Sequence, residues 1–340
     1  MSTVDEALAA VAERVAAAPP TEAEAAEAWT RVQLARHPQR PRTLDLVRRI
    51  FTEFTELAGD RAFRDDPAMV GGPALLDGRP VMVIGHQKGN DTDSNIARNF
   101  GSAHPEGFRK AQRLMRLAEK LGMPVVTFLD TAGAFPGPAA EERGQAEAIA
   151  SSIKLMAGLR VPTVVCIVGE GGSGGALAIG VGDEVIALEN AVYSVISPEG
   201  CAAILWRSPE EARIAAAAMR MTAAEQVALG IVDEVVAEPG EGAHTDPDAT
   251  ARVLKRAIVA SLARLARRDT GELLAARYAR IRSVGVYRET PVDRARRPGE
   301  AGLRDRLGRI LHLPGVGRRR WSDVWPGAGA DDNGDAEGGA

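Results

Sequence analysis

The feature that most constrains this chain is a glycine-rich break inside the apolar stretch Val161–Gly182. The stretch opens with β-branched residues up to Val168, which predicts a buried strand. It passes through residues 169–175, GEGGSGG, and resumes as small apolar residues at Ala176–Ile179, which predicts the first turns of a buried helix. A strand that runs through a glycine loop into a helix presents free backbone amides, which an anion can approach closely.

Several chemistries fit such a loop. A P-loop would need a lysine after the last glycines, and Ala176 stands there instead. Residues 169–174 fit a Rossmann GxGxxG fingerprint by letter, but no preceding strand–helix–strand context with a placed acidic residue supports it. The amides could also form an oxyanion hole for an enolate oxygen, or the segment could be only a tight turn packed against a neighbour. The loop alone leaves these alternatives open.

The composition excludes several classes of protein. The 340 residues, 45% of them hydrophobic, suffice for one large domain or two modest ones. Cys166 and Cys201 are too few and too far apart for a zinc site or a disulfide framework, so we expect free thiols and a cytoplasmic protein. We recognise no signal peptide and no apolar run long enough to span a membrane. A net charge of −4 gives nucleic-acid binding little support.

A second glycine loop follows another buried strand. Pro124–Leu129 is apolar and leads into residues 130–137, DTAGAFPG, and a long helix is predicted from about Ala139 to Leu159. Parallel strands of one sheet bring the loops at their carboxyl ends together, and ligands bind at that edge. We therefore predict that residues 130–137 and 169–175 lie side by side.

The rest of the chain reads as alternating strands and helices. Asp77-Gly78 predicts a hairpin between strands Val70–Leu76 and Arg79–Gly85, and His86 to Gly101 reads as a polar loop. Further strands are predicted at Val185–Leu188, Ala191–Ile196 and Ile231–Val236, and helices at Val4–Ala18, Thr21 toward His37, Thr43–Leu57, Pro105–Leu121, Cys201–Trp206, Ser208–Met221, Thr222–Leu229, Pro247–Arg268 and Thr270–Ser283.

These patterns divide the chain into three regions. Residues 1–40 form an N-terminal helical region, which we expect to pack on the domain surface or on another chain. Residues 41–286 form the main domain with its C-terminal helices. Residues 287–340 are dominated by Arg, Pro, Gly and Asp, so we expect a mostly disordered tail.

Several short segments together carry a family resemblance. They are ARHPQRP (35–41), GDRA (59–62), IGHQKG (84–89), RNFG (98–101), PEGFRKA (105–111), DTAG (130–133), EERGQ (141–145), GEGGSGGALAIGVGD (169–183) and YSVISPEGCA (193–202). With them the chain closely resembles the carboxyltransferase α subunit of bacterial multisubunit acetyl-CoA carboxylase over about residues 30–285. The last fifty or so residues look like an extension that is not usual in the family.

The resemblance implies an architecture and a set of partners. The fold would be α/β of the ClpP/crotonase-like type, a spiral of ββα units, with an N-terminal helical hairpin and C-terminal helices. The assembly would be a heterotetramer of two α and two β subunits, served by a biotin carboxyl carrier protein and joined by an ATP-using biotin carboxylase. The family's β subunit carries a four-cysteine zinc ribbon. This chain has no CxxC pair, which fits an α subunit alone with no metal site.

The resemblance also implies a reaction and its site. The enzyme would move the carboxyl group from carboxybiotin on the carrier protein to acetyl-CoA, giving malonyl-CoA for fatty acid biosynthesis. Carried onto this chain, Gly174 and Gly175 hold the amides that face the biotin ureido oxygen as carbon dioxide leaves. The implied biotin-binding residues are Gly133, Phe135, Pro136, Gly137, Gly172, Ser173 and Ala176. No catalytic side-chain triad is needed if biotin itself takes the methyl proton.

Some residues admit two interpretations. The family usually has proline where this chain has Ala132, which loosens the turn of residues 130–137. Phe135 could pack on the biotin ring or be a core aromatic, and Glu170 could orient the glycine loop or be exposed. For His86 we favour structural hydrogen bonding over catalysis. For Arg109-Lys110 we favour a solvated basic face over contact with CoA or the β chain.

Other functions remain possible on the same fold. A malonate decarboxylase subunit or an enoyl-CoA hydratase would keep the architecture and change the chemistry. A hydratase would need a glutamate pair near the enolate, for which Glu141-Glu142 are the nearby candidates. A non-catalytic scaffold that only joins a β subunit to the carrier is the third class.

Overall fold

The computed structural model describes residues 19–284. The predicted helix Val4–Ala18 and the predicted disordered tail, 287–340, therefore lie outside the described residues. Among residues 19–284, none of the helices combines the length and the apolar character that crossing a bilayer requires.

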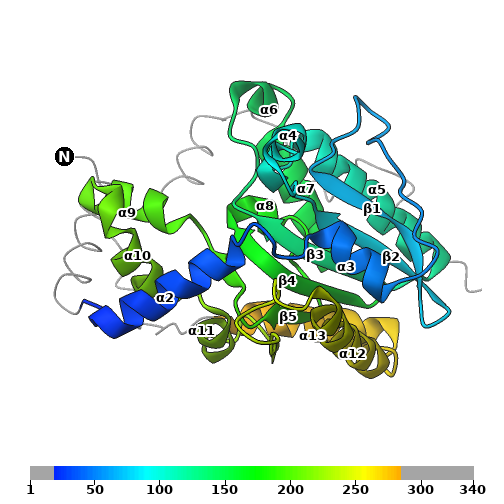
Figure 1. Ribbon diagram of the computed structural model, residues 1–340. Coiled ribbons are helices and arrows are strands. Elements are labelled where there is room, and N and C mark those ends of the chain that lie inside the picture. Colours follow the sequence, from blue (N-terminus) through cyan, green and yellow to red (C-terminus); the bar gives the residue numbers. More distant parts are fainter. Residues whose placement is uncertain (1–18, 285–340) are drawn as a thin grey trace, which may run out of the picture. The chain divides into compact units, whose positions relative to one another are not determined.

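A seven-stranded sheet forms the centre of the described region, with the strand order β1-β2-β3-β4-β5-β7 and β6 paired to β4 (Figure 1). Only β1 and β2 are antiparallel, and the other pairs are parallel. β5 pairs with the first half of β4 and β6 with its last three residues, so β4 is flanked along its length. The strands are β1 Met69–Leu76, β2 Arg79–His86, β3 Val125–Thr131, β4 Thr163–Gly172, β5 Glu184–Leu188, β6 Val192–Ser194 and β7 Glu234–Val236.

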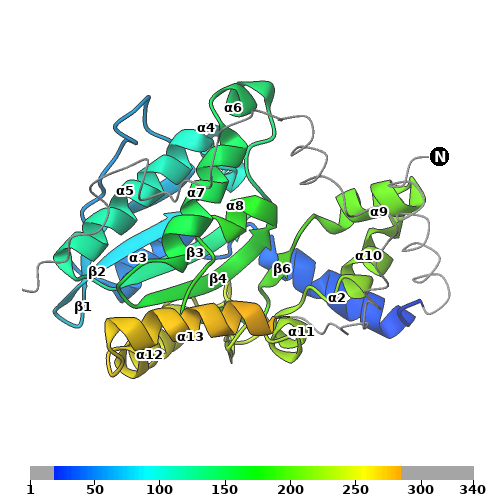
Figure 2. The ribbon, with the colours of Figure 1, turned by 180° about the vertical axis from the view of Figure 1, so that it is seen from behind.

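Helices cover both faces of this sheet. Helices α5 and α7 lie on the face that Figure 2 turns forward, whereas α3 and α12 pack together on the other. The helices are α2 Glu22–Ala35, α3 Thr43–Ile50, α4 Thr92–Ala97, α5 Pro105–Leu121, α6 Pro138–Glu142, α7 Gln145–Ala157, α8 Ser173–Leu177, α9 Pro198–Trp206, α10 Ala212–Ala218, α11 Ala223–Ala228, α12 Pro247–Leu265 and α13 Thr270–Ser283, with 3₁₀ turns η1 Asn99–Gly101 and η2 Pro209–Glu211.

The β1–β2 hairpin forms as predicted. Asp77 and Gly78 both have positive φ, 48° and 75°, which the two-residue turn of such a hairpin requires. The predicted helix Thr43–Leu57 is wrong beyond Ile50. Instead, the amides of Thr52, Thr55 and Leu57 donate to carbonyl groups of β1. The apolar residues that suggested a longer helix therefore run in extended chain along the edge of the sheet and cover it.

Three smaller differences separate the structure from the predicted elements, and local backbone signals explain the first two. The long helix predicted from about Ala139 to Leu159 is split into α6 and α7, because Gly144 between them adopts a φ of +82°. The predicted polar loop after His86 contains the short helix α4. Asp91 is the N-cap of this helix and forms a capping box with Ser94. The predicted helix Ser208–Met221 is reduced to η2 and α10.

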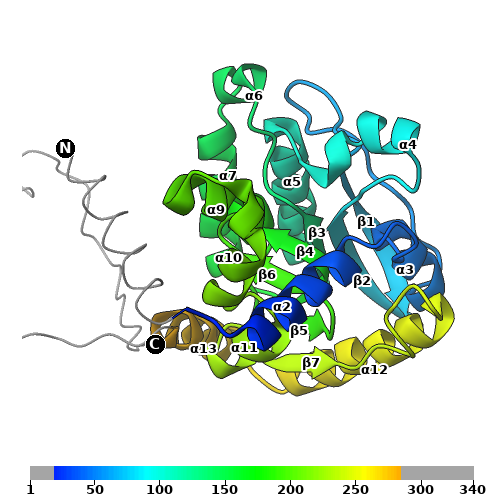
Figure 3. The ribbon, with the colours of Figure 1, turned by 60° about the vertical axis from the view of Figure 1, so that its left-hand side comes forward.

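The helix that opens the described region packs against a segment far along the chain. Thr21 and Glu24 form the predicted capping box at the start of α2. Helix α2 lies against α10 (Figure 1 and Figure 3), and the contact forms a hydrophobic cluster separate from the main core. The contact is a small hydrophobic cluster of mostly short side chains, namely Ala25, Ala28, Val32, Ala35, Val192, Ala216, Ala217 and Met221.

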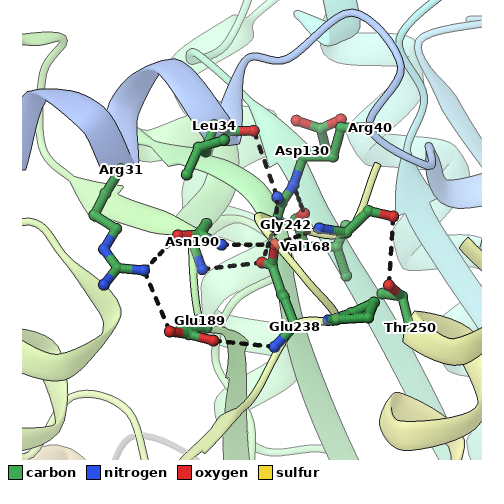
Figure 4. A network of polar contacts seen from close by, with 12 residues as sticks. Arg31, Leu34, Arg40, Asp130, Val168, Glu189, Asn190, Glu238, Gly242 and Thr250 are labelled. Atoms are coloured by element: carbon green, nitrogen blue, oxygen red, sulfur yellow. Dashed lines mark hydrogen bonds and ion pairs between the residues drawn. The ribbon is translucent and has the colours of Figure 1, made fainter. Parts of the chain in front are cut away.

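A buried ion pair ties the chain after α2 to the sheet (Figure 4). The Arg40 guanidinium contacts both Glu238 oxygens at 2.5 and 3.0 Å and donates from Nε to the carbonyl oxygen of Val168 at 2.6 Å. The amides of Asn190 and Ala243 also donate to this carboxylate. Burial alone would raise the pKa of Glu238, but Arg40 and Asn190 outweigh it and hold that pKa below its ordinary value.

Candidate active site

The two glycine loops lie in direct backbone contact, which confirms that they are side by side. Strands β3 and β4 are parallel, and after a register shift Thr131 pairs with Gly171. A Cβ added to Gly172 would lie 2.2 Å from the carbonyl oxygen of Ala132, and one added to Gly175 would lie 2.4 Å from the nitrogen of Ala134. Only glycine permits this approach at either position.

The glycine loop ends in the first turn of α8. Gly172 caps this helix without any side-chain hydrogen bond, and Ser173 has a φ of +55°. Gly175 and Ala176 are buried, Gly174 is half-buried and Ser173 is exposed. Within residues 19–284, no group accepts a hydrogen bond from the amides of Gly174 and Gly175. Both amides are therefore left free of protein acceptors, and Gly175 lies where the two loops meet.

The neighbouring loop is held by its own threonine. The Thr131 hydroxyl donates to the carbonyl oxygen of Gly133 at 2.7 Å and accepts from the Gly133 amide at 3.0 Å. Gly133 has a φ of +155°. These bonds hold the turn with alanine at position 132, and Ala132 and Pro136 are exposed at its rim.

Phe135 is neither a core residue nor fully free. Its half-buried ring stacks on His104, with centroids 4.2 Å apart and planes inclined by 21°. The side chain of Gln145 donates to the Phe135 carbonyl oxygen at 2.9 Å. Gly137 must lack a side chain here, because a Cβ would lie 2.4 Å from the Phe135 ring. The ring is thus held in place beside the exposed part of the loop.

A cluster of buried charges lies where the strands that carry the two loops end. Lys88 Nζ is 2.8 Å from Asp130 Oδ1 and 2.7 Å from Glu170 Oε2. Arg42 contacts the second oxygen of Asp130 at 3.3 Å, and Arg36 contacts the other oxygen of Glu170 at 2.7 Å. Beyond these, Arg36 also pairs with the Glu199 carboxylate of α9 at 2.6 Å. The cluster joins three cations to three carboxylates, so its charges balance.

The pKa shifts of the cluster follow from its pairing. Burial alone would lower the pKa of Lys88, but Asp130 and Glu170 outweigh it and hold that pKa above its ordinary value. Burial would raise the pKa of both carboxyl groups, yet Lys88, with Arg42 for Asp130 and Arg36 for Glu170, holds each pKa below its ordinary value. All three groups are therefore charged at neutral pH.

Sequence patterns did not predict this cluster, except for Glu170. Of the two interpretations of Glu170, the orienting one fits, because its side chain is only 12% exposed and is bound by two cations. Lys88, Asp130 and Arg36 stand inside the segments HQKG, DTAG and ARHPQRP, which carry the family resemblance. Charged residues inside the segments that carry the family resemblance are therefore the sequence feature that could have indicated this cluster.

The structure agrees with a structural rather than a catalytic His86, although not with hydrogen bonding of its ring, and it contradicts the solvated face expected at Arg109-Lys110. The His86 ring is fully buried and, within residues 19–284, neither ring nitrogen has a hydrogen-bond partner. Burial lowers the pKa of His86 to about 4, so the ring is neutral. Nor do Arg109 and Lys110 form a solvated basic face. Lys110 is fully buried against Asp65 Oδ1 at 2.5 Å, and Arg109 contacts Asp60 Oδ2 at 2.8 Å.

The structure also places the remaining candidate residues. Glu141 and Glu142, which a hydratase would need, are exposed on α6. Cys166 and Cys201 are free thiols, as expected. Within the described range, no group of three or more histidine, cysteine or acidic side chains could hold a metal ion.

Comparison with known proteins identifies the family. A family model described as "Acetyl co-enzyme A carboxylase carboxyltransferase-like" matches residues 2–285. The chain is 58% identical over 262 residues to the acetyl-coenzyme A carboxylase carboxyl transferase subunit alpha of Ralstonia nicotianae, covering 77% of this chain and 81% of that protein. It is 59% identical over 258 residues to the subunit of the same name in Photobacterium profundum, covering 76% and 81%. The chain belongs to this carboxyltransferase α-subunit family.

Solved structures that the carboxyltransferase α subunit resembles establish its fold. Transcarboxylase 12S matches with a TM-score of 0.55 at 19% identity, over 71% of this chain and 45% of that one. The β subunit of Pseudomonas aeruginosa geranyl-CoA carboxylase matches with a TM-score of 0.52 at 20% identity, over 69% and 43%. A Pseudomonas malonate decarboxylase hetero-tetramer matches with a TM-score of 0.52 at 22% identity, over 64% and 89%. The predicted crotonase-like α/β fold is confirmed.

Family membership also decides between the functions that the sequence left open. The carboxyltransferase α subunit shares 56–59% identity with relatives of that name, whereas its likeness to malonate decarboxylase is one of fold alone. A decarboxylase or hydratase activity is therefore not favoured. The chain is a subunit of a carboxyl-transfer enzyme, and the subunit name places it in a multisubunit complex.

Proposed function

We propose that this chain binds carboxybiotin between its two glycine loops and, together with a β subunit, transfers the carboxyl group to acetyl-CoA to form malonyl-CoA. A biotin carboxyl carrier protein would present the biotin, and a biotin carboxylase would recharge it. The assembly would be a cytoplasmic heterotetramer of two α and two β subunits, with zinc only in the β subunit. The observation that carries the proposal is the pair of acceptor-free amides at Gly174 and Gly175, the second of which belongs to a residue packed against the neighbouring loop.

The free amides suit a ligand with an oxygen that gains negative charge. Carboxybiotin supplies the carboxyl group as carbon dioxide and, after losing it, a base for the methyl proton. The amides of Gly174 and Gly175 would donate to the ureido oxygen, and removing one such donor typically costs about 3 kcal/mol of transition-state stabilisation. Gly133, Phe135, Pro136 and Gly137 would form one wall, and Gly172, Ser173 and Ala176 the other.

In this proposal the chain contributes position and fixed dipoles rather than a reactive side chain. Because the amides belong to a backbone that is packed against a second loop, they need not reorganise as charge develops. His86 is buried and neutral in the structure, which makes it unsuited to exchange protons with a ligand. The methyl carbon of acetyl-CoA would be presented from the β subunit.

The test is reconstitution from purified parts. The full-length chain, its zinc-containing β partner and the carboxylated carrier should together form malonyl-CoA from acetyl-CoA, whereas either subunit alone should not. Gly174→Leu should abolish turnover while the complex still assembles, because the new side chain enters the half-buried face of the loop. Gly158→Leu, at the exposed end of α7, is the control and should remain active.

Two results would contradict the proposal. One is an assembled wild-type complex that forms no malonyl-CoA from carboxylated carrier. The other is a Gly174→Leu complex that turns over like the Gly158→Leu control. A complex that instead decarboxylates malonyl groups without any biotin carrier would support the malonate decarboxylase alternative.

A further inference from the structure

One ammonium group touches the base of both loops. Lys88 Nζ contacts Asp130, the first residue of the loop 130–137, at 2.8 Å. It also contacts Glu170, the residue directly before the glycines 171–175, at 2.7 Å. Among the cations of residues 19–284, Arg42 reaches only Asp130 and Arg36 only Glu170 within this pair. Among the positively charged side chains of residues 19–284, Lys88 alone therefore contacts both Asp130 in β3 and Glu170 in β4.

The backbone around this ammonium leaves no room for other side chains. A Cβ on Gly101, whose φ is +78°, would lie 2.9 Å from Lys88 Cγ and 2.8 Å from the carbonyl oxygen of Asp130. A Cβ on Gly169 would lie 2.4 Å from Asp130 Oδ1. Gly101 and Gly169, which lie outside the ligand-facing part of the loops, thus allow Lys88 and Asp130 to come into contact.

The contact is also shielded from water. The side chains of Lys88, Asp130 and Glu170 are 9%, 1% and 12% exposed. The Glu170 amide adds a direct link by donating to Asp130 Oδ1 at 3.3 Å. Removing the shared cation would leave two carboxylates facing each other in the interior, and they would separate or take up a proton. Either change would move one loop relative to the other.

We propose that Lys88 is a positioning residue for carboxyl transfer, which sets the separation between loop 130–137 and the Gly174 and Gly175 amides. The inference rests on the proposed function for its kinetic consequence, but the coupling of the loops is a property of the chain itself. Lys88 acts through Asp130 and Glu170 and does not touch the substrates.

The experiment compares two buried lysines in the assembled complex. Lys110 is also buried and paired, with Asp65, but it lies on α5 and contacts neither loop. Lys88→Met should lower kcat for malonyl-CoA formation at least 30-fold more than Lys110→Met, with the KM for acetyl-CoA within twofold of wild type. Lys88→Arg retains a cation, so its kcat should be at least tenfold higher than that of Lys88→Met.

Hydrogen–deuterium exchange gives a readout that needs no turnover. Lys88→Met should raise exchange at amides 131–137 and 172–177 together, and Lys110→Met should leave both unchanged. If Lys88→Met does not fold, the charge-balanced variant Lys88→Met with Glu170→Gln replaces it, because it removes one charge of each sign and still breaks the link. This double variant should show the same decrease in kcat and the same increase in exchange as expected for Lys88→Met.

The outcomes separate this inference from the proposed function. Unchanged exchange at both loops, or a kcat within threefold of the Lys110→Met value, would overturn the role of Lys88 and leave the proposed function intact. A wild-type complex without any carboxyl transfer would reject the proposed function, and the exchange result would still decide whether Lys88 couples the loops.

Discussion

Substituting Gly175 with alanine adds a single methyl group at the point where the two loops touch. The ideal Cβ lies 2.4 Å from the nitrogen of Ala134 and 2.6 Å from the carbonyl carbon of Gly133. Both are backbone atoms, which cannot rotate away as a side chain can. At Gly174, the same addition meets only the Ile149 side chain, at ordinary distances of 3.5 and 3.7 Å. Neither glycine has a positive φ, so alanine strains neither backbone.

The size of the effect follows from the distance that must be restored. Since ordinary contacts begin near 3.4 Å, the loop at Ala134 must move by about 1 Å. A misplacement of about 1 Å in a catalytic arrangement can cost about 10²-fold in rate. That factor corresponds to about 2.7 kcal/mol of activation free energy. We therefore expect Gly175→Ala to lower kcat about 100-fold and Gly174→Ala to stay within about fivefold of wild type.

The assay is the steady-state formation of malonyl-CoA by the assembled complex, with each variant also checked for assembly by size-exclusion chromatography. The two alanine variants differ by one position and carry the same chemical change, so each is the other's control. Turnover of Gly175→Ala within threefold of wild type would show that the loop contact does not set the geometry of the site. A slower Gly174→Ala than Gly175→Ala would refute the steric reasoning altogether.

Two further predictions concern buried titratable groups. The pKa of His86 is lowered to about 4, whereas that of an unfolded histidine is about 6.5, so between pH 7 and 5 only the unfolded chain takes up this proton. The free energy of unfolding should therefore fall by about 2 kcal/mol over this range because of His86. Urea unfolding should show this extra loss in the wild type but not in His86→Gln. Equal losses in both would contradict the assignment. Arg40→Met removes the partner of the buried Glu238 and should lower the free energy of unfolding by about 3–5 kcal/mol in the same assay. Adding Glu238→Gln to this variant should restore most of the lost stability. Additive losses in the double variant would show that the two residues are not coupled.

The parts of the fold that the sequence predicts well are those set by local chemistry. Asp77-Gly78 specifies its turn because few residues tolerate two successive positive φ values. Helix α5 begins at Pro105 and ends before Gly122, as its start and stop signals indicate. The contact between the two glycine loops also followed, because parallel strands bring their carboxyl ends to one edge.

The parts that failed depend on partners far along the chain. Thr52 and Leu57 leave the predicted helix because β1 offers unpaired backbone groups, which no local pattern records. The helical pattern alone predicts Lys110 on the surface, but in the fold Asp65 pairs with it and allows it to be buried. Lys88 likewise gains its position only when Asp130 and Glu170 meet it, so the glycines of the site could be predicted and the charges beneath them could not.

The packing of α2 on α10 has a consequence for the order in which the chain is made. The two helices, Glu22–Ala35 and Ala212–Ala218, share a small core that neither completes alone. At roughly 5–20 residues per second, a ribosome takes about 10 to 35 s to travel from one to the other. A helix as short as α2 is marginal in water by itself. Its apolar stripe therefore stays open to chaperones through most of translation, and the first helix described here is among the last to find its place.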